Sequence, residues 1–94
     1  MSVTRINEFH AAPDKARALH DFLSGVIHII RDAPGCRSVE LFVGQDDESY
    51  LAIIEAWESV EAHQAAASRI PPARLAEVQP LLAEPPKGRY YRHP

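Results

Sequence analysis

The run Asp32-Ala33-Pro34-Gly35-Cys36 constrains the fold of this chain more than any other segment. Proline cannot continue a helix, and glycine readily adopts the left-handed conformation that ends one, so a helix must stop here. Further along, Trp57-Glu58-Ser59 predicts the start of another helix, because the Ser59 hydroxyl can cap a free backbone N–H. Between these two marks the sequence predicts a β-hairpin.

The segment before the stop, residues 13–32, has the pattern of one amphipathic helix. Its apolar side chains recur at the helical period of about 3.6 residues, which places them on one stripe. We expect Pro13 in the first helical turn, where its missing N–H costs nothing. The stripe consists of Ala16, Leu19, Leu23, Val26, Ile27 and Ile30.

Strand-like segments make up the hairpin and both ends of the chain. The segments 37–43 and 50–57 alternate or run apolar in lengths typical of strands, and the polar stretch 45–49 predicts the hairpin turn between them. We also expect a first strand at 3–9 and a short last strand at 89–92. A second helix is expected from Ser59 to about Ser68, and a shorter third one between the proline pairs at 71–72 and 85–86.

The order strand, helix, strand, strand, helix, strand is that of a ferredoxin-like split βαβ arrangement. This is an α+β fold with one four-stranded antiparallel sheet. The chain has 94 residues, which suits a single domain spanning 1–94.

Charge and composition exclude several classes of partner. The formal net charge is -3 and the Lys and Arg residues are scattered, so there is no basic stripe for nucleic acid. No apolar run of about 18 residues and no signal-peptide pattern occurs, so we expect no membrane partner and a cytoplasmic location. Cys36 is the only cysteine, which excludes an internal disulfide and fits a reducing compartment.

The predicted sheet has apolar side chains on both faces. The strand segment 51–54 is apolar throughout, and Phe42 points away from the face that Val39 and Leu41 share. Helices cover only one face, so the second needs another cover. We expect a homodimer in which two sheets face each other and close a barrel. The alternative is that the last residues, including Tyr90 and Tyr91, fold over this face.

Several of these motifs together resemble the antibiotic biosynthesis monooxygenase domain. They are the first strand ending near Asn7, the Ala-Pro-Gly helix stop, the strand end Ala56-Trp57-Glu58-Ser59, the helix Val60-Glu61-Ala62-His63-Gln64 and a last strand containing Tyr. The resemblance implies a dimeric α+β barrel with one substrate pocket per subunit, between the sheet and its own helices. It also implies three possible activities: cofactor-independent oxygenation of polycyclic phenols, quinol monooxygenation and haem degradation.

The haem-degrading branch is excluded by two positions. That branch resembles this chain at Asn7, but it places a Trp and an iron-binding His where this sequence has Ala66 and Leu75. Leucine cannot donate a lone pair to iron. The sequence does not support a site for other cofactors either, since it has no glycine-rich dinucleotide motif, no Walker motif and no metal-ligand spacing among the five histidines. We therefore expect no metal and no cofactor.

A cofactor-free oxygenase needs a dry site that holds an aromatic ring, assists loss of a proton and stabilises a developing oxyanion. The catalytic candidates are Asn7 as an amide donor, Trp57 as an indole donor or wall, and His63 as the base. Each has a structural alternative: local backbone pairing for Asn7, packing for Trp57 and a solvated helix position for His63. The expected substrate-binding residues are Phe9, His20, Leu23 and Phe42.

Two carboxylates also stand out. If the hairpin turn centres on Asp47, Glu40 and Glu55 fall almost opposite one another on neighbouring strands. They would then either share a proton as an acid–base pair or pair with arginine near the surface.

Three functions remain open. The first is a cofactor-independent monooxygenase that acts on a quinol or polycyclic phenol, with a small aromatic substrate and O2 as its partners. The second is an isomerase on the same fold, which needs a base but no oxygen. The third is a non-catalytic dimer that binds a small molecule or serves in a stress response. One architecture hosts many chemistries, so the fold alone does not choose among them.

Overall fold

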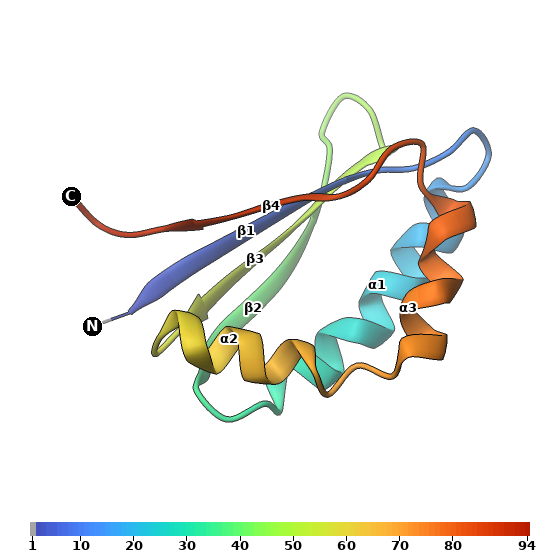
Figure 1. The fold of residues 1–94 in the computed structure, drawn as a ribbon. Coiled ribbons are helices and arrows are strands. Elements are labelled where there is room, and N and C mark those ends of the chain that lie inside the picture. The colour runs from blue at the N-terminus through green and yellow to red at the C-terminus, as the bar shows by residue number, and fades with distance from the viewer. Residues whose placement is uncertain (1) are drawn as a thin grey trace.

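One four-stranded antiparallel sheet, in the order β2-β3-β1-β4, forms one layer of the protein (Figure 1). The computed structural model describes residues 2–94. The strands are β1 (Val3–His10), β2 (Cys36–Val43), β3 (Tyr50–Trp57) and β4 (Lys87–Tyr91). The helices are α1 (Ala16–Arg31), α2 (Val60–Ala67) and α3 (Pro72–Val78), and the 3₁₀ turn η1 (Gln79–Leu81) follows α3.

All three helices lie on one side of the sheet, and both ends of the chain lie near each other at the far end of β1 and β4 (Figure 1). The predicted α+β, ferredoxin-like fold is therefore confirmed. The last strand begins two residues earlier than expected, at Lys87, and ends at Tyr91.

The first helix begins three residues later than the sequence predicts. Pro13 occupies the second position of a turn in which the Lys15 N–H donates to the Ala12 carbonyl at 2.9 Å. Asp14, at the third position, has a φ of 65°, which is the left-handed conformation that a type II turn requires there. A residue in this conformation cannot belong to a right-handed helix, so α1 starts only after it.

The end of α1 follows the prediction. Its last helical residue is Arg31, and Gly35 has a φ of 86° in the turn that leads into β2. The glycine also lies against α2, because a Cβ added at Gly35 would come within 2.7 Å of the Ala62 Cβ. Position 35 therefore requires glycine both for its conformation and for its packing.

The hydrophobic core lies between α1 and the sheet. Leu19 and Ile53 are almost completely inaccessible to solvent, and the rest of the expected α1 stripe is buried or packs against the core. A second, smaller cluster contains Trp57, Ala33 and Ala66. At the start of α2, the Ala62 N–H donates to the Ser59 hydroxyl at 3.1 Å, so Ser59 is the predicted cap.

The hairpin register separates the two carboxylates that the sequence places together. The pairing is centred on Asp47, as expected, but it aligns Glu40 with Ile54 and Glu55 with Val39. A shift of one residue in a strand moves a side chain to the opposite face. Glu40 is therefore exposed on the outer face and Glu55 is buried on the inner one, so the predicted Glu40–Glu55 pair was wrong.

The outer face of the sheet carries exposed apolar side chains. Its exposed large residues include Phe42, Tyr50, Ile54 and Tyr91. The C-terminal residues do not fold over it, because β4 pairs with β1 and extends the sheet. Within residues 2–94, no helix combines the length and the apolar character needed to cross a bilayer.

Candidate active site between the sheet and the helices

A cavity of about 270 Å³ separates the inner face of the sheet from the helices. Most of its wall is apolar and comes from all three helices and the two central strands. The apolar lining residues are Phe9, Phe22, Leu23, Val26, Ile30, Ile53, Trp57, Ala66, Ala67, Ile70, Leu75, Val78 and Pro86, and the polar ones are Arg5, Asn7, Glu55 and His63.

Five of the seven predicted site residues border this cavity. They are Asn7, Phe9, Leu23, Trp57 and His63. The alternation of β1 and β3 directs every second side chain to the helices, and the first turn of α2 brings His63 above them.

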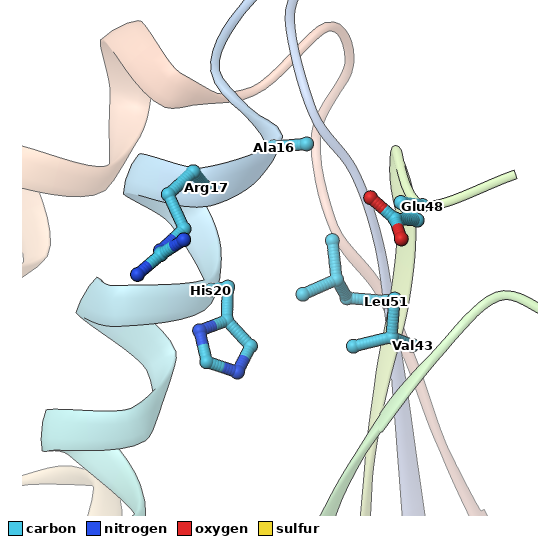
Figure 2. Close-up of a pocket in the computed structure, with 6 residues that line it drawn as sticks. All are labelled: Ala16, Arg17, His20, Val43, Glu48 and Leu51. Atoms are coloured by element: carbon cyan, nitrogen blue, oxygen red, sulfur yellow. The ribbon is translucent and has the colours of Figure 1, made fainter.

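The other two predicted residues, His20 and Phe42, lie elsewhere. Phe42 is 46% exposed on the outer face, because its neighbour Leu41 takes the inward position on β2. His20 borders a different hollow of about 340 Å³ between the start of α1 and the hairpin (Figure 2). Its ring lies 3.1 Å from the Asp21 carboxylate and is half exposed. Neither residue lines the cavity.

The hollow in Figure 2 has little that would support chemistry. The charged side chains around it, Arg17 and Glu48, are exposed, and none of the described residues that line it is a buried polar one. We therefore place the candidate active site in the smaller cavity, where titratable side chains are shielded from water.

Glu55 is the only charged side chain within residues 2–94 that is fully buried. Its Oε1 accepts a 2.7 Å hydrogen bond from the Trp57 indole N–H. Burial raises the pKa of the Glu55 carboxyl above its usual value, and the Trp57 bond and the positive charge of Arg5 only partly oppose that rise. The indole N–H is thus bonded to the protein. It does not point at a substrate oxygen, which was one of the roles considered for Trp57 from the sequence.

His63 lies between Glu55 and Tyr90. Its Nε2 is 3.9 Å from Oε1 of Glu55, and its Nδ1 is 2.5 Å from the Tyr90 hydroxyl. The imidazole also meets the Trp57 ring edge to face, with centroids 5.5 Å apart. Burial lowers the pKa of His63, and the charge of Arg5 lowers it further, so the ring is neutral at neutral pH.

One row of the sheet collects the polar groups. The register aligns Tyr90 of β4, Arg5 of β1 and Glu55 of β3 on neighbouring strands, and we call these three residues the polar row. The Arg5 guanidinium lies over the Tyr90 ring, 4.7 Å from its centroid. The next row along β1 and β4 pairs Asn7 with Gly88. None of the side-chain hydrogen bonds within residues 2–94 involves Asn7.

Glu55, Arg5 and Tyr90 were not among the predicted site residues, although Glu55 was singled out as one of two neighbouring carboxylates. Glu55 could have been placed in the site, because it interrupts the alternating apolar positions Ile53 and Trp57 that face the helices. Arg5 shares the face of Asn7 and was open to the same argument. Tyr90 could not, since its position depends on the register between β4 and β1.

The donor set does not fit a metal or haem. Within the described part of the chain, no three His, Cys, Asp or Glu side chains come together as ligands would. Ala66 and Leu75, the positions compared with the haem-degrading branch in the sequence analysis, both line the cavity and neither can coordinate iron.

The fold and the cavity define a ferredoxin-like α+β domain with a buried carboxyl group in an apolar chamber. The chain belongs to the antibiotic biosynthesis monooxygenase family, whose model matches residues 2–84. No sequence among proteins of curated function matches it.

Solved structures agree with this assignment. The chain is similar to Rv0793 from Mycobacterium tuberculosis, with 27% identity and a TM-score of 0.86 over 99% of this chain and 95% of that one. PA3566 from Pseudomonas aeruginosa shows 23% identity and a TM-score of 0.85 over 98% and 93% of the two chains. SnoaB, a cofactor-independent oxygenase from Streptomyces nogalater, shows 16% identity and a TM-score of 0.80 over 98% and 92%. The last two likenesses establish the fold alone.

Proposed function

We propose that this protein is a cofactor-independent monooxygenase that oxidises a small hydroquinone or related phenol with O2. The observation that carries the proposal is the buried Glu55 carboxyl beside the neutral imidazole of His63, at the polar end of a cavity with otherwise apolar walls. Family membership supports the same reaction class, because SnoaB in that fold is an oxygenase that needs no cofactor.

The size of the cavity limits the size of the substrates that can fit. A volume of about 270 Å³ is close to the lower end, roughly 300 Å³, of the usual range for small-molecule pockets. It suits one or two fused rings better than the larger polycyclic phenols that the sequence analysis also allowed. Phe9 and Leu23 supply apolar surface for such a ring.

In the proposed reaction, the ionised Glu55 carboxylate accepts the phenol proton while His63 forms a hydrogen bond with the same substrate oxygen. Their closest nitrogen and oxygen atoms are 3.9 Å apart, too far for a direct hydrogen bond. A substrate hydroxyl placed above this gap can reach both atoms at hydrogen-bond distance. A carboxyl with a raised pKa is a stronger base once ionised than an ordinary glutamate, which favours proton transfer near neutral pH.

The deprotonated substrate then supplies all four electrons that reduce O2, two for the oxygen atom that enters the ring and two for the one that leaves as water. One oxygen atom of O2 enters a ring C–H bond as a hydroxyl or carbonyl oxygen, and the other leaves as water with two hydrogens from the substrate. Asn7, whose amide has no side-chain hydrogen-bond partner within residues 2–94, is proposed to donate to the substrate oxygen as negative charge develops. The protein thus needs no cofactor for this step.

An isomerase is the second candidate, because the same two titratable groups could move a proton between substrate carbon or oxygen atoms without O2. Anaerobic turnover of the substrate would distinguish it. A non-catalytic binding protein would bind the ligand and turn nothing over.

The proposal includes a cytoplasmic homodimer. Phe42 and Ile54 lie on the outer face of the sheet with 46% and 37% of their surfaces exposed, and a second copy packed sheet to sheet would bury them.

Oxygen uptake tests the proposed function. The purified protein, checked by its absorption spectrum for bound chromophores, is mixed with hydroquinone and with naphthohydroquinone in an oxygen electrode. We expect uptake above the autoxidation rate and a loss of about 100-fold or more in Glu55→Gln, the size typical of losing a general base. Asn7→Ala should lose activity while it melts within a few degrees of the parent.

His20→Gln is the matched control, since His20 lies outside the cavity and should leave uptake unchanged. Uptake no faster than autoxidation across both compounds would reject the monooxygenase.

A further inference from the structure

Arg5 is a partly buried charged group that makes no ion pair with the described residues. None of the ion pairs within residues 2–94 includes Arg5, although the side chain lines the cavity and its Nε is completely buried without a hydrogen bond. A buried N–H donor is costly unless a hydrogen-bond acceptor joins it.

The neighbours of Arg5 do not satisfy it. Glu55 is its cross-strand partner on β3, but that carboxyl accepts the Trp57 N–H and makes no ion pair with Arg5. Tyr90 offers Arg5 only the face of its ring. By contrast Arg74, which also has a buried Nε, has the Glu77 carboxylate 4.0 Å away. Within residues 2–94, Arg74 therefore has an ion-pair partner and Arg5 has none.

Gly88 leaves the space that the Arg5 guanidinium occupies. A Cβ added at Gly88 would overlap Nη2 of Arg5 and come within 3.1 Å of Oδ1 of Asn7. The ends of both side chains thus converge on the strip of β4 where no side chain stands. Both residues border the cavity, so a ligand in it can reach them.

We propose that the cavity selects a hydroxyaromatic acid, whose carboxylate forms a two-pronged pair with Arg5 beside Gly88. The planar guanidinium matches a carboxylate in this geometry, which an ammonium group cannot do as well. The ring then extends along the apolar wall toward Phe9 and Leu23, and its hydroxyl faces Glu55 and His63. This inference rests on the proposed function for the reaction, but it concerns binding, which can be measured separately.

The test compares 2,5-dihydroxybenzoate with its methyl ester, two ligands that differ chiefly in one negative charge. Calorimetric titration without oxygen should show that the acid binds the parent protein at least about tenfold more tightly than the ester. Arg5→Gln should reduce this preference to less than about twofold and leave the ester's affinity nearly unchanged. Arg5→Lys should show a preference for the acid between those of the parent and of Arg5→Gln, because lysine keeps the charge but loses the two-pronged geometry of the guanidinium.

Two further variants keep the test decisive if Arg5→Gln folds poorly. Gly88→Ala adds a methyl group that must displace the Arg5 guanidinium, so it should weaken acid binding more than ester binding. Arg89→Gln is the matched control, because Arg89 is exposed and the neighbouring Gly88 and Tyr90 take the inward positions on β4. It should change neither affinity.

Equal binding of acid and ester to the parent protein, failure to bind either, or an acid preference that survives both Arg5→Gln and Gly88→Ala would overturn the inference. Its failure is distinguishable from that of the proposed function. A protein that selects the acid but consumes no oxygen retains this inference and rejects the monooxygenase. A protein that oxidises neutral hydroquinone and binds both ligands equally retains the monooxygenase and rejects this inference.

Discussion

Trp57 and Glu55 lie two residues apart on the inner face of β3, and the indole N–H of Trp57 donates a 2.7 Å hydrogen bond to the Glu55 carboxyl. The indole is itself completely buried, so it both fixes the carboxyl and keeps water from one side of it. A single strand therefore supplies the candidate base and the group that orients it.

Replacing Glu55 by Gln should change the dependence of stability on pH. Because the pKa of Glu55 is raised in the folded state, the folded protein holds more protons than the unfolded one from about pH 4.3 up to that raised value. The free energy of unfolding of the parent therefore falls, relative to that of Glu55→Gln, as pH rises through this window. Above the raised pKa the difference stays constant.

Urea unfolding of both proteins at a series of pH values measures that difference. His63 acts in the opposite direction, since its lowered pKa makes the unfolded state bind more protons as pH falls below about 6.5. Comparison with Glu55→Gln isolates the carboxyl because both proteins keep His63. A difference that does not change with pH would show that Glu55 ionises normally.

Tyr90→Phe should alter the site without unfolding the protein. The change removes the hydroxyl that lies 2.5 Å from Nδ1 of His63, and loss of one such bond costs about 1 kcal/mol of stability. We expect the pH dependence of kcat to shift, because the imidazole loses the partner that sets its tautomer.

Tyr91→Phe is the control, since Tyr91 is 44% exposed and lies outside the residues that line the cavity. Identical pH profiles for the parent and Tyr90→Phe would show that the Tyr90–His63 contact has no part in the reaction.

Gly35→Ala should destabilise the protein by about 1–3 kcal/mol, the usual cost of a strained backbone. Alanine at a φ of 86° is strained, and its Cβ would lie 2.7 Å from that of Ala62. Chemical denaturation measures the loss. Because the turn lies outside the cavity lining, the fraction that remains folded should bind ligand normally, and a variant as stable as the parent would contradict the packing described for α2.

Ile54→Glu should convert the proposed dimer into a monomer. Ile54 is 37% exposed in the single chain, and a charge there would be buried without a partner between two sheets. Sedimentation should give twice the monomer mass for the parent and the monomer mass for the variant. Gln64→Glu adds the same charge at an exposed position on α2 and should leave the mass of the parent unchanged. A monomeric parent would reject the dimer.

The parts of the fold that depend on local sequence were predictable. The apolar period placed the buried face of α1, and Pro34-Gly35 placed its end, because both effects act within a few residues. The start of α1 was predicted wrongly, since Pro13 fits the first turn of a helix and the second position of a type II turn equally well. The left-handed backbone conformation of Asp14 is what shows that Pro13 lies in a type II turn and not in the helix.

The site was harder to predict because it depends on register. An offset of one residue decides whether Glu55 lies opposite Glu40 or opposite Val39, and a local pattern does not determine such an offset. The contact between His63 and Tyr90 joins residues 27 apart in the sequence, and it requires β4 to pair with β1. Phe42 and His20 were misplaced relative to the cavity because each lies next to the residue that takes the inward position, Leu41 on β2 and Leu19 on α1.

The most direct test of the account is to supply naphthohydroquinone with isotopically labelled O2 and to analyse the product by mass spectrometry, in the parent and in Glu55→Gln. The account predicts one labelled oxygen atom in each product molecule, formed faster than in buffer alone, and little product from the variant. An unlabelled quinone, or the same rate with and without the parent protein, would contradict it.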